Sequence, residues 1–557
     1  MAQPSPSSVT VPDGFTLHTE NTSHILLPSN NEAFLNPIQE FNRDLSVATI
    51  RAWSELSNKT KEERWRQTRE KKLEKMGKLD DVSAPLPLAA AADTGDTIDT
   101  TSDPARYRPF KFVILEALSA TGLRSIRYAK EIPLVKYVIA NDLSSSAIAA
   151  MTRNVELNGL GGAPAAEGSG HGAEQNQAKV RVNEGDARTL MYSHSPERSR
   201  VDVVDLDPYG TAAPFIDAAV QCITDGGLLC VTCTDLSVLA TNNYPEKCYS
   251  NYGGVSVKAE YSHEVALRLV LHTISTSAAR YGRYIQPLLS LSIDFYVRLF
   301  VRVQTAPVEV KKLASKTSIY YACSGCQSFY EQPLGRMTER VNDRSGNTTT
   351  LFKTHVGPPV SEKCPECGAP LHVAGPMWNG PIHDPQFIGG ILEHLESSED
   401  KYGTSTRMKG MLTVAKEELS APFYFTPSRV ASFFHCTCPS LDEIASALLH
   451  AGHQVSRSHA VPGSLKTTAA RRDLHDVYRS WVKTHPVKME KIPPNSPART
   501  LLQKEPSVEA NFTSHPLTVT QSSKIKLVRY QPNPTPNWGP ATRAESGTKR
   551  KRHEKDE

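Results

Sequence analysis

The chain has 557 residues, of which 39% are hydrophobic and 22% are charged, and its formal net charge is +4. This length suffices for about two to four domains with buried cores, and the small net charge permits nucleic-acid binding without arguing for it. No run of about 18 uncharged apolar residues occurs. The best stretch, residues 284–303, contains Asp294 and Arg298, which excludes a membrane span.

Several stretches have the composition of connectors rather than of folded elements. Residues 1–30 predict a flexible N-terminal tail, and residues 493–557 predict a mostly disordered basic tail. A first folded domain is expected at residues 31–315. Residues 80–104, rich in Ala, Asp, Thr and Pro, and residues 161–178, rich in Gly, Ala and Glu, predict surface insertions within it.

Short apolar runs alternate with helical stretches between residues 112 and 235, which is the pattern of a parallel sheet with crossover helices. Strands are predicted at residues 112–118, 137–141, 180–183, 201–206 and 228–232. Helices are predicted at residues 123–131, 144–157 and 213–223. The pattern indicates an α/β fold whose ligands bind at the carboxyl ends of the strands.

The first strand is followed by the small-residue turn Ser119-Ala120-Thr121-Gly122, where the glycine lets the backbone approach a ligand. Asp142 ends the second strand about 20 residues later and can accept hydrogen bonds from ribose hydroxyls. Asp186, with the backbone of Ala187, can read an adenine edge. A single glycine disfavours a pyrophosphate cofactor and leaves adenosine-type ligands such as S-adenosylmethionine. In the alternative interpretation, these acids are ordinary solvated loop residues.

The run Asp207-Pro208-Tyr209-Gly210 follows the fourth strand and resembles the D/N-P-P-Y/F signature of methyltransferases that act on exocyclic amines. The lone pair of such an amine is delocalised into the ring, so it attacks a methyl sulfonium only when acceptors hold its N–H bonds. The Asp207 carboxylate and the Pro208 carbonyl can be those acceptors, and the ring of Tyr209 can support a flipped base. The alternative is a simple turn.

Five stretches together resemble the tRNA guanine-26 N2,N2-dimethyltransferase family of the eukaryotic, fungal type. They are residues 36–44 (NPIQEFNRD), 115–128 (LEALSATGLRSIRY), 205–210 (DLDPYG), 280–284 (RYGRY) and 289–298 (LSLSIDFYVR). The resemblance implies a Rossmann-like class I methyltransferase domain that transfers two methyl groups from S-adenosylmethionine to N2 of guanine 26 in tRNA. The two insertions depart from the family pattern, which affects loop contacts and not the active site.

The resemblance also implies roles for individual residues. Asp207, with Pro208 and Tyr209, is expected to be catalytic, and Phe34 with Tyr209 to sandwich the guanine. Cofactor contacts are expected from Arg43, Gly122, Arg124, Asp142, Asp186 and Ala187. Two alternatives stay open: an amino methyltransferase acting on another RNA, on DNA or on protein, and an inactive RNA-binding protein with this fold.

Two C-x-x-C pairs, Cys323 with Cys326 and Cys364 with Cys367, each place two thiolates on one turn, and four sulfurs fit tetrahedral zinc. Because no open ligand position is implied, the zinc should be structural. It would lie at residues 318–372 of a separate α+β C-terminal domain, residues 316–492. The alternative is four unrelated thiols, and Cys436 and Cys438 are interpreted as ordinary packing residues.

Two helical regions carry basic residues. Ser440 can cap a helix at residues 441–449, and the basic set Lys466, Arg471 and Arg472 follows it. Residues 64–72 form a second basic helix. Both suit tRNA backbone contact, although a solvated charged face explains them equally well.

The location is indicated by the two ends of the chain. Residues 1–14 have neither an apolar core nor an arginine, which disfavours a secretory signal or mitochondrial presequence. The basic run at residues 549–552 fits nuclear import. We expect a monomeric, tRNA-binding protein in the nucleus, with the cytoplasm or mitochondrion as alternatives.

Overall fold

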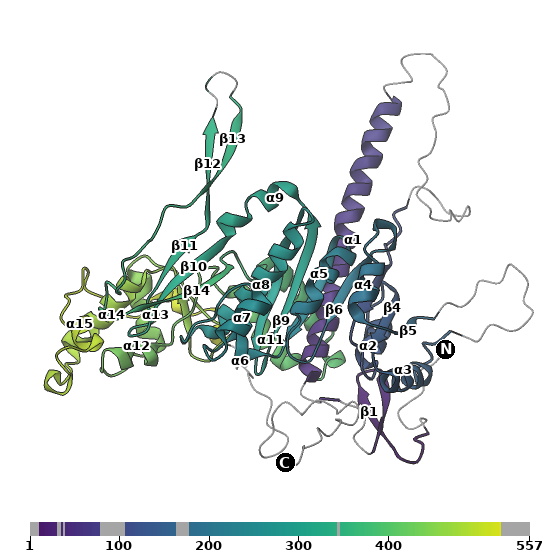
Figure 1. Ribbon diagram of the computed structural model, residues 1–557, viewed down its shortest axis with the longest axis horizontal. Coiled ribbons are helices and arrows are strands. Elements are labelled where there is room, and N and C mark those ends of the chain that lie inside the picture. Colours follow the sequence, from purple (N-terminus) through teal and green to yellow (C-terminus); the bar gives the residue numbers. More distant parts are fainter. Residues whose placement is uncertain are drawn as a thin grey trace, which may run out of the picture.

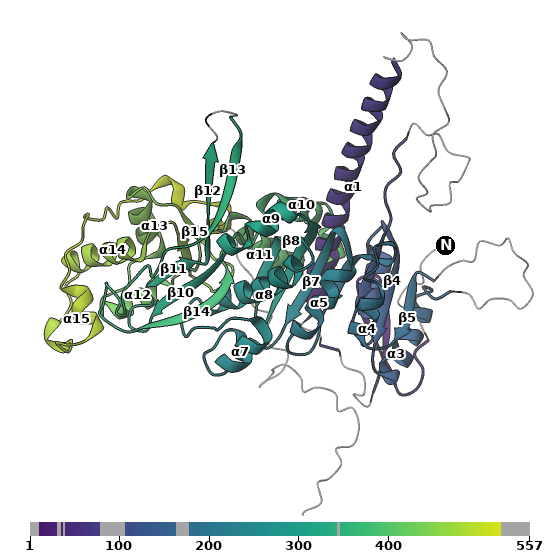
Figure 2. The ribbon, with the colours of Figure 1, turned by 45° about the horizontal axis from the view of Figure 1, so that its top comes forward.

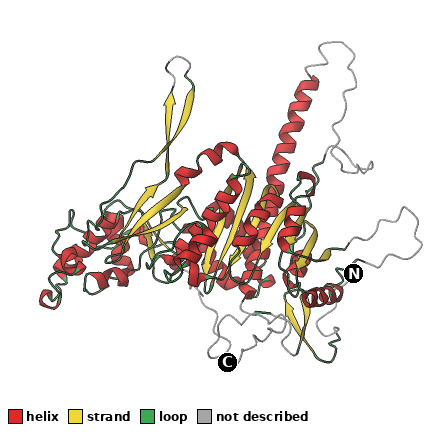
Figure 3. Cartoon of the chain, viewed as in Figure 1, coloured by secondary structure: helices red, strands yellow, loops and turns green. Residues whose placement is uncertain are grey.

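The computed structural model describes residues 10–29, 35–36, 39–77, 106–162, 178–341, 343 and 346–524. Its centre is a seven-stranded sheet with helices on both faces (Figures 1 and 3). The strand order is β5-β4-β3-β6-β7-β9-β8. The strands are β3 (Phe112–Glu116), β4 (Val135–Asp142), β5 (Val180–Glu184), β6 (Val201–Leu206), β7 (Ile223–Cys233), β8 (Arg283–Ile293) and β9 (Tyr296–Thr305).

The first five of these strands are parallel, which confirms the α/β fold predicted from the sequence. Their apolar, β-branched runs suit strands that are covered on both faces. The antiparallel strands β9 and β8 complete the sheet beyond β7 and were not predicted. Residues 284–303 read as one long apolar run because the turn between these strands is only two residues long, Asp294 and Phe295.

The helices of the N-terminal part cover both faces of the sheet. α4, α5 and α8 pack on one face, and α2, α3 and the first half of α1 pack on the other. The bounds are α1 (Glu40–Gly77), α2 (Leu123–Glu131), α3 (Ser145–Leu157), α4 (Ala187–Ser193), α5 (Ala213–Cys222), α6 (Leu236–Leu239), α7 (Pro245–Tyr252), α8 (Ser262–Ala279) and α9 (Pro307–Lys311).

The C-terminal part contains a three-stranded sheet of order β11-β10-β14, a long β12–β13 hairpin and a group of short helices. The strands are β10 (Thr317–Cys323), β11 (Phe329–Pro333), β12 (Gly335–Val341), β13 (Thr348–Thr354), β14 (Leu371–Trp378), β15 (Val455–Arg457) and β16 (Leu465–Thr467). The helices are α10 (Pro385–Ser397), α11 (Ser405–Glu417), α12 (Pro427–Phe433), α13 (Leu441–His450), α14 (Arg471–Thr484), α15 (Pro497–Leu502) and α16 (Gln521–Lys524). Ser440 caps α13, as the sequence predicted, and Glu443 completes a capping box with it.

The expectation of a separate domain from residue 316 onward is wrong for α10 and α11. Their apolar side chains, among them Ile388, Ile391 and Leu412, are fully buried in the same cluster as α1 and the central sheet. The N-terminal helices leave this face of the sheet partly uncovered, and α10 and α11 close it. The two parts therefore share one hydrophobic core, and only the region from α12 onward has a cluster of its own around the cysteines.

Both predicted tails are partly folded. β1 (Phe15–Glu20) and β2 (Ser23–Pro28) form a hairpin, with Ile25 fully buried beside α2 and α3. At the other end, α15 and α16 lie within the predicted tail, and Leu501 is buried in the cluster around the cysteines. The polar composition of these segments predicted disorder, but a few apolar residues suffice to pack a polar segment against the folded body. The predicted insertions lie almost wholly outside the described residues.

The second half of α1 projects from the body of the molecule, as does the β12–β13 hairpin, in both views of Figures 1 and 2. Trp53 Nε1 donates a hydrogen bond to the Gly226 carbonyl, 3.3 Å away, near the start of β7. The helix therefore leaves the sheet at the edge opposite the carboxyl ends of the parallel strands. Its basic residues 64–72 lie beyond that edge. Among the described residues, no helix is long and apolar enough to cross a membrane.

A chain that ends after Thr305 should fail to fold, because it loses α10 and α11 and exposes the apolar face of the sheet to water. We expect mostly insoluble protein, and no cooperative thermal transition by circular dichroism in the soluble remainder. A chain that ends at Lys524 keeps every described element and serves as the control. Cooperative unfolding of the shorter chain near the control temperature would contradict the shared core.

Candidate active site at the carboxyl edge of the sheet

The loop that follows β6 carries Asp207 and Tyr209 and is fixed to the neighbouring strand. The Gly210 amide donates to Thr234 Oγ1 at 2.8 Å, and the Thr234 amide donates to the Gly210 carbonyl at 2.9 Å. Gly210 has a φ of 80°, which favours glycine at this turn. The Asp207 side chain is 14% exposed and Tyr209 is 53% exposed. An acid with limited access to water thus lies beside an accessible aromatic ring.

The turn between β3 and α2 also needs its glycine. Gly122 has a φ of 77°, and a Cβ there would lie 2.6 Å from Met151 Cγ. Arg124, in the first turn of α2, forms an ion pair with the Asp207 carboxylate. The sequence resemblance assigned Arg124 to the cofactor, whereas this contact joins it to the predicted catalytic acid.

Beneath this ion pair lies a second one, between Arg298 of β9 and Asp205 of β6, with 2.7 Å between Arg298 Nη1 and Asp205 Oδ1. Both side chains are fully buried. Ser46 of α1 accepts hydrogen bonds from Arg124 at 3.1 Å and from Arg298 at 2.8 Å. Burial alone would raise the pKa of Asp205, but the positive charges of Arg298 and Arg124 outweigh it and lower that pKa.

Glu116, at the end of β3, completes this charged group. Its Oε1 lies 3.6 Å from Arg124 Nε, and its Oε2 accepts a hydrogen bond from Ser125. Burial raises the pKa of Glu116 to about 8 despite the nearby Arg124. The raised pKa favours the neutral form of Glu116, which leaves Arg124 to neutralise the aspartates.

Arg43 is committed to the protein rather than open to a ligand. Its guanidinium binds both oxygens of Glu20 in β1, with 2.7 Å between Arg43 Nε and Glu20 Oε2. The hairpin predicted as tail supplies this acid, so the contact could not be anticipated. The next acid, Asp44, pairs with Arg127 at 2.7 Å and accepts from Thr404 Oγ1, also at 2.7 Å. Asp44 thus ties the start of α1 to α11.

Asp142 lies where the sequence predicted, at the end of β4, and it shapes the neighbouring turn. Its Oδ2 accepts from the Ala120 amide and its Oδ1 from the Ser144 amide, each at 3.0 Å. A carboxylate has about four acceptor positions, so two bonds leave capacity for a ligand.

Asp186 is the N-cap of α4. Its Oδ1 accepts from the Arg188 amide at 2.8 Å and the Thr189 amide at 3.2 Å. The amide of Ala187, the first in the helix, has no acceptor within the helix and can meet a ligand. Phe34, the other expected base contact, lies outside the described residues.

The glycine turn after β3, Asp142 after β4, the Ala187 amide after β5 and Asp207 after β6 thus meet at one edge of the sheet. This arrangement on an α/β sheet defines a class I methyltransferase. The sequence did not single out Glu20, Ser46, Asp205 or Arg298. For Asp205 and Arg298 a signal existed, since each is a charge inside a mainly apolar strand.

Comparisons with known proteins agree with this class. The family model for N2,N2-dimethylguanosine tRNA methyltransferase matches residues 14–479. A tRNA (guanine(26)-N(2))-dimethyltransferase of Schizosaccharomyces pombe is 45% identical over 94% of this chain and 92% of its own. The corresponding protein of Mus musculus is 43% identical over 95% of this chain and 77% of its own. The chain belongs to the N2,N2-dimethylguanosine tRNA methyltransferase family, as the resemblance predicted.

The solved structure of Trm1 from Pyrococcus horikoshii with S-adenosyl-L-methionine has the same fold. It aligns with a TM-score of 0.59 at 23% identity, covering 84% of this chain and 99% of that one. The Rossmann-like arrangement of the sheet is therefore confirmed.

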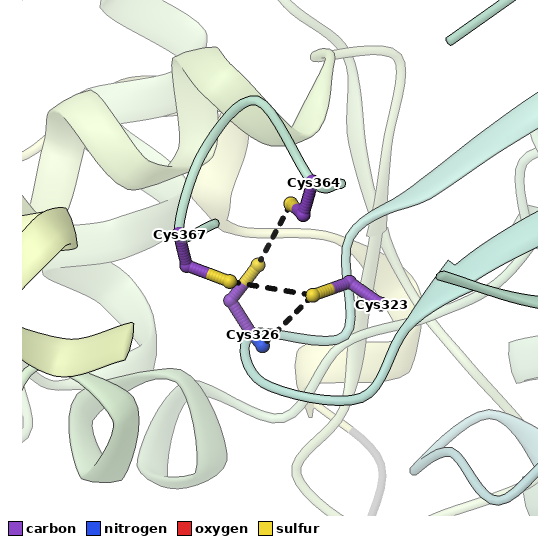
Figure 4. Close-up of side chains that lie close together, drawn as sticks. All are labelled: Cys323, Cys326, Cys364 and Cys367. Carbon is purple, nitrogen blue, oxygen red and sulfur yellow. Dashed lines mark hydrogen bonds between the residues drawn. The ribbon is translucent and has the colours of Figure 1, made fainter. Parts of the chain in front are cut away.

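The four predicted cysteine ligands come together in one cluster (Figure 4). Their sulfurs all lie within 4.8 Å of one another, with 3.3 Å between Cys323 and Cys367 and 3.7 Å between Cys326 and Cys364. Four thiolates at about 2.3 Å from a zinc ion would be about 3.8 Å apart, so the cluster fits a tetrahedral site.

The second cysteine knuckle is fixed to a helix. Glu366, between Cys364 and Cys367, bonds to Arg479 at 2.8 Å and to His475 at 3.3 Å, both in α14. These bonds lower the pKa of Glu366 to about 2 although burial opposes ionisation. The knuckle is thereby attached to the helices that follow it.

A second buried cluster, His383, Glu418 and His459, does not suit a metal. The Ser292 amide donates to His459 Nε2 at 3.1 Å, so its proton is on Nδ1, which donates to Glu418 at 2.6 Å. The Ser290 amide likewise faces His383 Nδ1 at 3.4 Å. In both rings the nitrogen toward Glu418 carries the proton. The cluster therefore connects β8 to the C-terminal part through buried hydrogen bonds.

The predicted basic set after α13 is only partly on the surface. Lys466 is fully buried and pairs with Glu264 at 3.2 Å and Glu418 at 3.3 Å. Arg471 is 8% exposed, and only Arg472 is accessible. The tRNA contact suggested for this set is therefore wrong for Lys466 and Arg471. Lys466 neutralises two buried glutamates, and Arg471 donates a hydrogen bond to the Tyr424 carbonyl.

Arg298→Met should destabilise the fold strongly, since it removes the cation but leaves the Asp205 carboxylate buried. A loss of about 3–5 kcal/mol is expected in urea unfolding. Arg66→Met, on the exposed part of α1, should change stability by less than about 0.5 kcal/mol. Adding Asp205→Asn should recover part of the loss, and an unchanged urea midpoint for Arg298→Met alone would contradict the assigned pairing.

Proposed function

We propose that this chain transfers two methyl groups from S-adenosylmethionine to the exocyclic N2 of guanine 26 in tRNA. The observation that carries the proposal is the Asp207 loop at the carboxyl edge, paired to Arg124 and adjoining the exposed Tyr209. The names of the relatives support the same reaction and the same target nucleotide. Acid and aromatic ring together suit a flipped base whose amine must be oriented.

S-adenosylmethionine supplies the electrophilic methyl group. Asp142 is suited to the ribose hydroxyls, the Ala187 amide with Asp186 to the adenine edge, and the turn at Gly122 to close approach of the ligand. Arg43 and Arg124 are better described as positioning residues, because their guanidinium groups hold Glu20 and Asp207. These residues would hold the cofactor on the side of the site formed by β3, β4 and β5.

The role proposed for Asp207 is to accept a hydrogen bond from the N2 amine, with the Pro208 carbonyl as second acceptor. The ion pair with Arg124 holds the Asp207 carboxylate at the edge of the sheet, where its oxygens can act as acceptors. Holding the N–H bonds turns the nitrogen lone pair toward the methyl group. With S-adenosylmethionine bound, its methyl–sulfur bond would break as the N–C bond forms, and Asp207 would be placed to take the proton that N2 releases. The remaining N–H allows a second round.

We further propose that the cysteine cluster holds one structural zinc ion. All four thiols are buried, which leaves no position for a substrate. The site joins the turn after β10 to the loop before β14, and Glu366 extends the connection to α14. Zinc would thus stabilise the fold of a region whose own apolar cluster is small.

The C-terminal part, residues 316–492, is proposed to bind the tRNA body, since folded RNA is recognised through shape and phosphate contacts. We propose a nuclear location on the basis of the basic run at residues 549–552, which lies outside the described residues. We also propose that the protein is a monomer.

Incubation of the protein with tRNA and labelled S-adenosylmethionine should produce N2,N2-dimethylguanosine at position 26 by nucleoside mass spectrometry. Asp207→Asn should lower turnover by about 100-fold or more, because a positioned acceptor is lost. Its cofactor affinity by calorimetry should stay nearly unchanged. Asp217→Asn, at an acid of α5 whose side chain is 35% exposed, is the control. Full turnover in Asp207→Asn would remove Asp207 from the chemistry.

Metal analysis of the purified protein should find about one zinc per chain. Cys323→Ser should lower the zinc content and the folding yield, because the ligand set is broken. Cys438→Ser, at an exposed cysteine outside the cluster, should leave both unchanged. Freshly purified protein without zinc would refute the site.

A further inference from the structure

The turn between β8 and β9 belongs to a stretch that resembles the family but has no role in the reaction described so far. Asp294 has a φ of 41°, and Phe295 is 49% exposed at the tip. Arg407 of α11 forms an ion pair with the turn, with 2.8 Å between its Nη2 and Asp294 Oδ2. Arg407 in turn lies over the ring of Phe41, 4.4 Å from its centroid. The turn is therefore fixed by the C-terminal part.

Tyr296, the first residue of β9, lies at the same sheet edge as Asp207. Val297 is opposite Cys233, the last residue of β7, so Tyr296 extends just beyond that strand end. Side chains alternate along strands, and Tyr296 shares a face with Arg298 and its partner Asp205. Asp207, two residues after Asp205, is on that face as well.

The strand order gives the spacing of the strands that carry the two residues and the sides of β6 on which they lie. β9 is two strands from β6, which corresponds to about 10 Å between the strands. The strands that carry the proposed cofactor residues, β3, β4 and β5, lie on the other side of β6. This strand spacing is close to the span of a purine between two hydrogen-bonding partners, and Tyr296 lies on the side of β6 away from the proposed cofactor residues.

The Tyr296 hydroxyl is a buried donor without a partner. The residue is 5% exposed, and its Oη has no hydrogen-bond partner in the described part of the chain. Buried tyrosine hydroxyls usually find a partner, and leaving one unpaired is costly. Burial raises the pKa of Tyr296, and Asp294 and Asp207 raise it further against the opposing charge of Arg407. The hydroxyl therefore keeps its proton and can donate it in a hydrogen bond.

We propose that the Tyr296 hydroxyl recognises the target base by donating a hydrogen bond to O6 of the guanine whose N2 is held at Asp207. This inference rests on the proposed function. The pairing edge of guanine carries two donors, N2 and N1, and then the acceptor O6, which matches an acid at one end and a hydroxyl at the other. Adenine carries an amino group in place of O6, so a donor there selects guanine.

Tyr296→Phe tests the proposal by removing only the hydroxyl. We expect kcat/KM for tRNA to fall by about tenfold, the effect of one lost hydrogen bond. Cofactor affinity by calorimetry should stay unchanged, and the thermal midpoint should not fall, because the hydroxyl bonds to no described residue. Tyr261→Phe is the matched control, since the Tyr261 hydroxyl is also buried and unpartnered within the described chain but lies at the start of α8.

Transfer RNA with 2-aminopurine at position 26 keeps N2 and lacks O6. Tyr296→Phe should lower kcat/KM on guanine but cause no further loss on 2-aminopurine. An equal loss on both bases, a loss accompanied by a lower thermal midpoint, or unchanged kcat/KM on guanine would each overturn the proposal. Failure of the wild-type protein to methylate tRNA would instead refute the proposed function.

Discussion

A group of buried charges fixes the active site, and the rest of the structure is arranged to neutralise it. Asp205 and Asp207 end one strand and would repel each other if they were buried alone. Arg124 from α2 and Arg298 from β9 compensate them, and Ser46 from α1 binds both guanidinium groups. Each arginine lost from such a site leaves an uncompensated charge, which costs far more than a surface ion pair. The two aspartates are therefore held in place by three separate elements, α2, β9 and α1.

The same constraint explains why the C-terminal part is inseparable from the sheet. α10 and α11 cover one face of the sheet, and α11 also supplies Thr404 to Asp44 and Arg407 to Asp294. Both contacts reach segments that border the site, the start of α1 and the β8–β9 turn. The part proposed to bind the tRNA body thus also fixes segments that border the proposed base site, which connects the two proposed tasks mechanically.

A second connection runs through the cysteine cluster. Glu366 lies between two of the four cysteines and bonds to His475 and Arg479, so closure of the knuckle also positions α14. The buried pair of Lys466 with Glu418 and Glu264 joins the same region to α8. Here positive charges that looked suited to RNA serve the interior instead, since an unpaired buried glutamate would be too costly.

The sequence by itself determined the parallel strands, the helices between them, the cysteine cluster and the acid at Asp207, because periodicity, turn residues and short motifs are local properties. It did not reveal that Arg43 meets Glu20, that Arg124 meets Asp207, or that β8 and β9 extend the sheet. These pairings join residues 23 to about 80 positions apart, and many partners would have satisfied each charge equally well. Only the folded chain selects among them, because burial makes one arrangement neutral and leaves the others with charges unpaired.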